Sequence, residues 1–136
     1  MANRKIEDIE GIGPVLGGKL RACGIKDSNS FLEQAKTPAL RKALAEKSGL
    51  TAKQVLKFAN MIDLFRVKGI GSEFAELLEA AGVDTVPELA RRKPDGLAKK
   101  MAEVNEAKKL TRRVPTEAEV GKWVQQAKAL PRALEY

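Results

Sequence analysis

The sequence contains no histidine and only one cysteine, Cys23. A zinc site, a Ser-His-Asp triad or a Cys-His pair all need residues that are missing here, so these chemistries are effectively excluded. Cys23 alone cannot form a disulfide within the chain, which is typical of proteins in a reducing cytoplasm. We therefore expect a cytoplasmic protein that holds no metal and no cofactor.

Long apolar runs are also missing. No run approaches the ~20 residues that a membrane-spanning helix needs. The first ten residues, MANRKIEDIE, lack the apolar centre of a secretory signal. We therefore expect no membrane partner. The 136 residues are 43% hydrophobic and 32% charged, which favours a folded chain, and the length fits one compact domain or two small subdomains sharing a core.

Alternating apolar and polar runs are absent as well, so no strand is predicted. Helices are indicated by capping boxes, in which a threonine and a residue three positions later satisfy each other's backbone amides. Gly24 and Gly82 have the position of helix C-terminal caps. Trp123 lies on an apolar stripe of helical spacing, which favours the core over a stacking platform for a nucleobase. The capping boxes are Thr51-x-x-Gln54, Thr85-x-x-Glu88 and Thr116-x-x-Glu119.

The two halves of the sequence repeat each other. Gly11-Ile12-Gly13 aligns with Gly69-Ile70-Gly71, and similar residues follow both turns at the same distances. We interpret the chain as a tandem duplication. Other aligned pairs are Leu20 with Leu78 and Gly24 with Gly82; further on, Val55 aligns with Val120 and Phe58 with Trp123, after an insertion over 103–113 that the first repeat lacks.

The glycine-rich stretch GIGPVLGGKL has three interpretations: a P-loop, a dinucleotide fingerprint, or the turn of a hairpin between two helices. Residues 13–19 match the P-loop pattern G-x-x-x-x-G-K, and the glycines from Gly11 to Gly17 form a loosened dinucleotide fingerprint. A P-loop needs a buried strand before it and a Ser or Thr after it, whereas IEDIE precedes this stretch and Leu20 follows it. The second repeat keeps Gly69-Ile70-Gly71 but has FAELL in place of the later glycines. The shared three-residue turn is therefore the motif.

EGIGPVLGGKLRACGI and KGIGSEFAELLEAAGV resemble the helix-hairpin-helix motif, which has Gly-hydrophobic-Gly between two helices. Glycines there permit a positive φ and close approach, and the amides after them form an anion site. Two copies resemble the double helix-hairpin-helix domain. That resemblance implies an all-α, SAM-domain-like compact bundle, which in many relatives grips duplex DNA through its phosphates. The expected parts are a first repeat over 4–64, a second over 65–131 and a tail over 132–136.

The resemblance extends to most of the chain. GIGSEFAELLEAAGVDTVPELA, EVNEAKKLTRRVPT and VGKWVQQAKAL together are similar to an uncharacterised bacterial family, a domain of unknown function classed with helix-hairpin-helix proteins. This similarity implies a fold and no activity. A lysine lyase activity occurs in some distant fold relatives, but it needs a pocket and a lysine of depressed pKa, and no residue here indicates one. We expect neither enzyme activity nor a small-molecule substrate.

Both turns depart from the pattern of DNA-binding relatives, which commonly have Lys or Arg just after the second glycine. Pro14 removes one amide donor from the first turn. Ser72-Glu73 follows the second turn, and a carboxylate there repels phosphate. These departures favour a protein-docking module that keeps the fold without binding nucleic acid.

The net charge of +7 and pI of about 9.6 favour a polyanionic partner instead. Residues 91–113 carry nine basic side chains against three acidic ones, either as an ordinary solvated helical face or as a patch for phosphates. Our first hypothesis is therefore binding to the backbone of DNA or RNA without sequence preference, and the second is docking to an unidentified protein. The expected contact residues are Gly11, Ile12, Gly13, Lys19, Lys68, Gly69, Gly71, Arg91, Arg92, Lys99 and Lys100.

Overall fold

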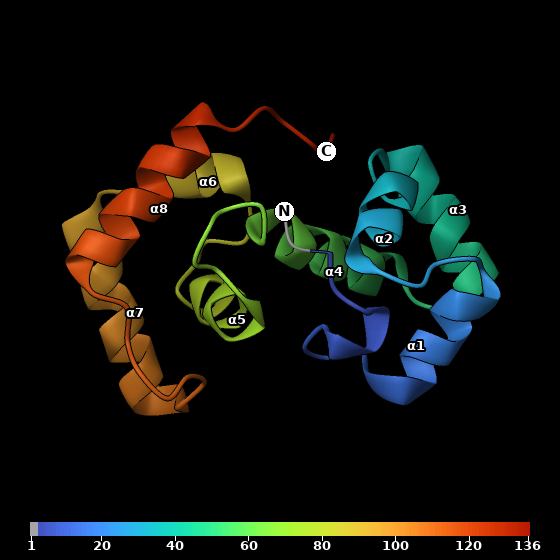
Figure 1. The fold of residues 1–136 in the computed structure, drawn as a ribbon, viewed down its shortest axis with the longest axis horizontal. Helices are drawn as coiled ribbons and strands as arrows, with labels where there is room; N and C mark the ends of the chain where they lie inside the picture. Colours follow the sequence, from blue (N-terminus) through green and yellow to red (C-terminus); the bar gives the residue numbers. More distant parts are fainter. Residues whose placement is uncertain (1–2) are drawn as a thin grey trace. The chain divides into compact units, whose positions relative to one another are not determined.

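The computed structural model describes residues 3–136, so the first two residues of the predicted domain lie outside it. These residues form helices and no strand; Lys5 and Asp27 make an isolated antiparallel bridge. The predicted all-α fold class is confirmed. The elements are η1 (Ile6–Asp8), α1 (Gly13–Ala22), α2 (Ser28–Gln34), α3 (Pro38–Ser48), α4 (Ala52–Leu64), α5 (Ser72–Ala80), α6 (Val86–Ala90), α7 (Pro94–Lys108) and α8 (Glu117–Ala129) (Figure 1).

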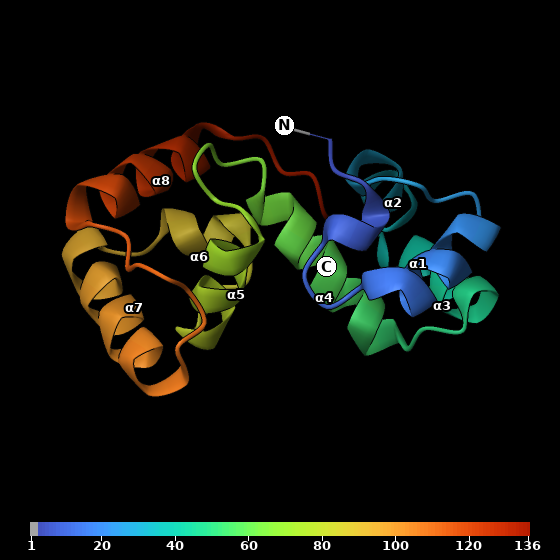
Figure 2. The ribbon, with the colours of Figure 1, turned by 60° about the horizontal axis from the view of Figure 1, so that its bottom comes forward.

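The contacts divide the described chain into two compact units. The first unit comprises residues 3–63 and 133–136, and the second comprises residues 64–132. In the first unit α1 packs against η1 and α3, and α3 also packs against α2 (Figure 2). In the second unit α8 packs against α6 and α7, and α5 packs against α7. None of the helices in residues 3–136 is both long enough and apolar enough to span a bilayer.

The order of helices follows the internal repeat. Helices α1 to α4 correspond in sequence to α5 to α8, and the aligned Phe58 and Trp123 lie in α4 and α8. Helix α7 has 15 residues and α3 has 11, and the insertion over 103–113 includes the end of α7 and part of the connection to α8. The insertion therefore lengthens both a helix that the repeats share and the connection that follows it.

Two of the predicted capping boxes are complete. The Thr116 hydroxyl accepts the Glu119 amide at 3.1 Å, while the Glu119 carboxylate accepts the Thr116 amide at 3.0 Å. Thr51 and Gln54 exchange the same two hydrogen bonds at 2.9 and 3.0 Å. These bonds satisfy backbone donors that a helix start leaves without partners, so α4 and α8 begin at the residues that the sequence indicates.

The predicted glycine caps are also confirmed. Gly24 has φ 84°, its N–H donates to the Arg21 carbonyl at 2.9 Å, and the Ile25 N–H donates to the Leu20 carbonyl at 3.0 Å. This pair of bonds is a Schellman motif, which requires a left-handed residue after the helix. Gly82 ends α5 with the same pair of bonds at φ 95°.

Candidate functional site

The first glycine turn, residues 11–13, is shaped by an aromatic ring from α4. Gly11 has φ 89° and Gly13 has φ 62°, which both favour glycine. A Cβ on Gly11 would lie 3.3 Å from Cε1 of Phe58. Ile12 is 4% exposed and anchors the turn in the core of the first unit. The glycine at position 11 therefore serves both the backbone conformation and the close approach of the ring.

The second glycine turn, residues 69–71, has the equivalent arrangement. Gly69 has φ 98°, and a Cβ there would lie 2.9 Å from Nε1 of Trp123. Trp123 is 2% exposed and its ring lies 5.3 Å from that of Phe74, so the core assignment of this residue is confirmed. Gly71 differs from Gly13, because its φ of −104° is an extended conformation open to any residue. Gly71 thus does not use the positive φ that we expected the glycines of the turn to permit.

The stretch that matched a P-loop pattern is helical. Residues 13–19 lie in α1, and η1 precedes them in place of a strand. Gly17 faces the side chain of Glu7, whose Cγ would lie 2.8 Å from an added Cβ. Glu7 accepts a hydrogen bond from Arg21 Nη2 at 2.7 Å, and this pairing lowers the pKa of the carboxyl to about 2. Gly17 thus makes room for an ion pair rather than for a nucleotide phosphate.

The surface around the first turn is apolar. Val15 is 73% exposed at the start of α1, beside the exposed Pro14. Lys19 is exposed further along the same helix. The first turn is therefore followed by two exposed apolar side chains at the start of α1.

The second turn borders a hollow with a different character. Its volume is about 330 Å³, and its lining residues come from the turn and from α8. The side-chain amide of Gln126 holds the turn, because Oε1 accepts the Lys68 N–H at 2.8 Å and Nε2 donates to the Lys68 carbonyl at 3.3 Å. The lining residues are Lys68, Gly69, Glu119, Lys122, Trp123 and Gln126.

The one carboxylate of this hollow is already paired. Glu119 accepts hydrogen bonds from Nη1 and Nη2 of Arg113 at 2.7 and 2.8 Å, and this pairing lowers the pKa of Glu119 to about 2. The Arg113 guanidinium also lies 5.2 Å from the centre of the Phe74 ring. The Lys68 and Lys122 side chains are exposed and have no carboxylate partner within residues 3–136. The hollow therefore combines two available cations with a neutralised anion.

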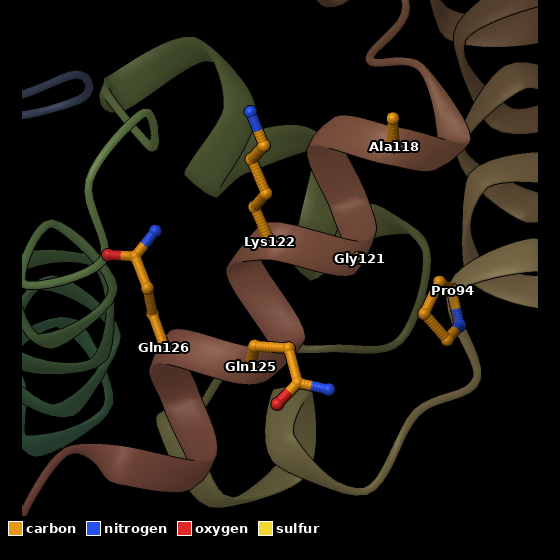
Figure 3. Close-up of a pocket in the computed structure, with 6 residues that line it drawn as sticks. All are labelled: Pro94, Ala118, Gly121, Lys122, Gln125 and Gln126. Atoms are coloured by element: carbon orange, nitrogen blue, oxygen red, sulfur yellow. The ribbon is translucent and has the colours of Figure 1, made fainter.

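A second, more open hollow of about 560 Å³ lies along the exposed side of α8. Figure 3 shows Lys122 and Gln125 leaving α8 in different directions, while Gly121 faces Pro94. A Cβ on Gly121 would lie 3.9 Å from Pro94, which is ordinary contact. Lys122 lines both hollows, so its amine can serve a ligand on either side.

The arginines at the start of the basic segment have structural partners. Arg91 pairs with Glu88 at 3.2 Å, and Arg92 pairs with the other oxygen of Glu88 at 3.2 Å. Arg92 also donates to the Gly82 carbonyl at 3.1 Å, just after α5. Glu88 therefore does not complete the capping box with Thr85, although its amide still donates to the Thr85 hydroxyl at 3.1 Å.

The connection between α7 and α8 is held by a side chain near the end of α7. The side-chain amide of Asn105 accepts the Thr111 N–H at 2.9 Å and donates to the Thr111 carbonyl at 3.1 Å. The other basic side chains are exposed and make no ion pair with a carboxylate in the described part of the chain. They are Lys93, Lys99, Lys100, Lys108, Lys109 and Arg112.

The predicted contact residues therefore fall into separate groups. Residues 11–13 and Lys19 belong to the first unit, and the others belong to the second. Lys68 and Gly69 line one hollow, Lys99 and Lys100 lie exposed on α7, and the two predicted arginines are paired. Sequence reasoning missed Lys122, although the repeat places a lysine directly before the aromatic residue in both copies.

A family model described as Domain of unknown function (DUF4332) matches residues 10–130. The match includes both glycine turns and all helices from α1 to α8. No curated protein and no solved structure shows significant similarity to the chain.

Proposed function

The chain belongs to the DUF4332 family of domains of unknown function, and we propose from its own residues that it binds the phosphate backbone of nucleic acid. Binding takes place on the second unit, without sequence preference. The hollow beside the second glycine turn holds one phosphate, and the exposed cations of residues 91–113 contact others. The glycine turns act here as the corners of helix-hairpin-helix motifs.

The observation that carries this proposal is the charge balance of the hollow. Lys68 and Lys122 supply two exposed ammonium groups, and Arg113 neutralises the charge of Glu119 by forming an ion pair with it. Lysine binds phosphate as a flexible point charge, which suits a backbone contact that carries no sequence information. Glu73, in the first turn of α5, is not among the lining residues, so its charge bears less on this hollow than on the start of that helix.

The arginines and lysines of the second unit differ in their partners, and this difference supports phosphate binding by the lysines. Arg91, Arg92 and Arg113 are engaged in ion pairs, so their charges contribute little to an outside ligand. Phosphate binding therefore depends on the exposed lysines and on Arg112. Neutralising several phosphates releases counterions, which makes such binding strong at low salt and weak at high salt.

The test uses fluorescence anisotropy with a labelled DNA duplex and a labelled single strand at low salt. The variant Lys68→Gln/Lys122→Gln should bind roughly tenfold more weakly or worse, because a hydrogen bond to a charged group contributes about 1.5 kcal/mol or more. The matched control is Lys42→Gln/Lys47→Gln, which removes two exposed lysines from α3 in the first unit. No detectable binding by the unmodified chain, or an equal loss in the control, would refute the proposal.

A second candidate function is docking to a protein, and the exposed apolar tip at Pro14 and Val15 favours it. In this case Val15→Glu should abolish the capture of a protein partner from cells and leave the affinity for the DNA duplex unchanged. Capture with and without nuclease separates the two functions, because a partner bridged by nucleic acid disappears after nuclease treatment.

A further inference from the structure

The last residues of the chain form an extended tail that packs on the first unit. Leu134 is 1% exposed, although no helix or strand includes it. The Glu135 N–H donates to the Lys36 carbonyl at 2.8 Å, in the connection between α2 and α3. The Tyr136 hydroxyl donates to Oδ1 of the buried Asn60 at 2.8 Å. The tail therefore has defined polar partners, and the residues that contact it, Lys36, Arg41 and Asn60, are called the groove below.

Arg41 is the central side chain of this groove. It is 7% exposed, and its Nη1 donates to the Ala35 carbonyl at 2.9 Å. Its Nη2 donates to the Glu135 carbonyl at 2.6 Å, and the guanidinium lies 5.8 Å from the centre of the Tyr136 ring. A buried cation needs hydrogen-bond acceptors, and the Glu135 carbonyl of the tail supplies one of the two that Arg41 has here.

The groove contacts alternate side chains of the tail, those of Leu134 and Tyr136. Leu134 is buried and the hydroxyl of Tyr136, a residue that stays 50% exposed, reaches Asn60, whereas Glu135, between them, contributes its backbone. This is the usual division in the recognition of an extended peptide, in which main-chain bonds give affinity and alternate side chains give specificity. The groove thus fits a segment of the pattern Leu-x-Tyr.

The connection to the tail is short and irregular. Helix α8 ends at Ala129, and residues 130–133 have neither helical nor strand structure. Pro131 lacks an N–H, and its carbonyl accepts a hydrogen bond from Arg66 at 2.6 Å. The tail is therefore an arm that follows residues 64–132 in sequence but makes its contacts with residues 3–63.

We propose that the groove formed by Lys36, Arg41 and Asn60 also accepts residues 133–136 of a second copy, giving a tail-exchanged dimer. Every contact of the tail can be made between copies without new chemistry, as in other exchanges of an identical element. Only the connection differs. The tail within one chain has an effective concentration of about a millimolar, so exchange is favoured when that arrangement is weakened.

The test is complementation between two full-length variants, followed by native mass spectrometry. Arg41→Ala damages the groove and keeps the tail, whereas Leu134→Asp damages the tail and keeps the groove. Each variant alone should be mainly monomeric. Their mixture should contain a heterodimer, because one chain offers an intact tail and the other an intact, vacant groove.

The matched control replaces Arg41→Ala by Lys42→Ala, a change of the exposed neighbour on α3. That chain keeps its own tail in its own groove, so its mixture with the Leu134→Asp chain should contain much less heterodimer. Equal heterodimer in both mixtures, or none in the first mixture while both variants keep their helical circular dichroism, would overturn the proposal.

A peptide experiment covers the case in which Arg41→Ala fails to fold. A labelled peptide with the sequence of residues 131–136 should bind the Leu134→Asp chain and bind the unmodified chain far more weakly. The peptide with Tyr136→Phe should bind roughly fivefold more weakly, because it lacks the hydrogen bond to Asn60. A peptide that does not bind the folded Leu134→Asp chain would show that the groove holds the tail only as a fixed part of one chain.

Discussion

Gly69→Ala is expected to destabilise the second unit severely, although it adds a single methyl group at an exposed position. The backbone there has φ 98°, and the added Cβ would meet Nε1 of the buried Trp123 at 2.9 Å. A left-handed conformation costs a residue other than glycine roughly 1–2 kcal/mol. Forcing a ring to move in a packed core typically costs about 1–3 kcal/mol. Together these effects reduce the free energy of unfolding by roughly 2–5 kcal/mol.

The assay is urea unfolding followed by tryptophan fluorescence, because Trp123 is the single tryptophan of the chain. Circular dichroism at 222 nm reports on all helices in the same samples. Gly121→Ala is the matched control, since it lies within α8 and its added Cβ would be 3.9 Å from Pro94. This substitution should be neutral or should stabilise the chain by up to about 1 kcal/mol, as expected for glycine to alanine in a helix.

The double variant Gly69→Ala/Trp123→Phe separates the two contributions; its unfolding is followed by circular dichroism, because it contains no tryptophan. The smaller ring should relieve the collision and leave the conformational cost, so the two substitutions should not be additive. If Gly69→Ala leaves the fluorescence transition at the same urea concentration as Gly121→Ala, the explanation of the geometry at Gly69 by ring packing and positive φ is refuted.

Two further predictions concern an ion pair and the insertion loop. The pKa of Glu7 is lowered from 4.5 to about 2, mainly by its hydrogen bond to Arg21, so the pair stabilises the fold above pH 4.5 and loses this effect as the pH falls toward 2. Glu7→Gln should therefore make the melting temperature fall less steeply between pH 4.5 and pH 2. The same fall in this variant and in the unmodified chain would contradict a stabilising pair of Glu7 with Arg21. Asn105→Ala should free the loop at Thr111 and speed tryptic cleavage at residues 108–113 with little change in overall helicity, whereas unchanged cleavage would show that the amide is dispensable.

Local patterns predicted the helix ends well. The capping boxes at Thr51 and Thr116 and the glycine caps at Gly24 and Gly82 depend on residues close in sequence, so their partners could be read from spacing. Trp123 could be assigned to the core because the helical stripe and the repeat agreed. These features need no knowledge of the tertiary fold.

Long-range pairing was harder to predict. From the sequence alone, Arg91 and Lys99 are equally good candidates for phosphate contact, but the fold pairs Arg91 with Glu88 and leaves Lys99 exposed. Lys122 lies beside Lys68 and Gly69 only because α8 packs next to the second turn, and local sequence does not indicate this packing. The acceptor of Arg41, the Glu135 carbonyl, lies 94 residues away, so no local pattern indicates the tail groove.

The salt dependence of duplex binding tests the central claim most directly. We propose that Lys68 and Lys122 contact phosphate, so each should contribute about 0.9 to the slope of log affinity against log salt concentration. The variant Lys68→Gln/Lys122→Gln should therefore show a slope that is shallower by about 1.8 than that of the unmodified chain. A slope that stays the same in this variant, with binding still present, would contradict phosphate binding at the second glycine turn.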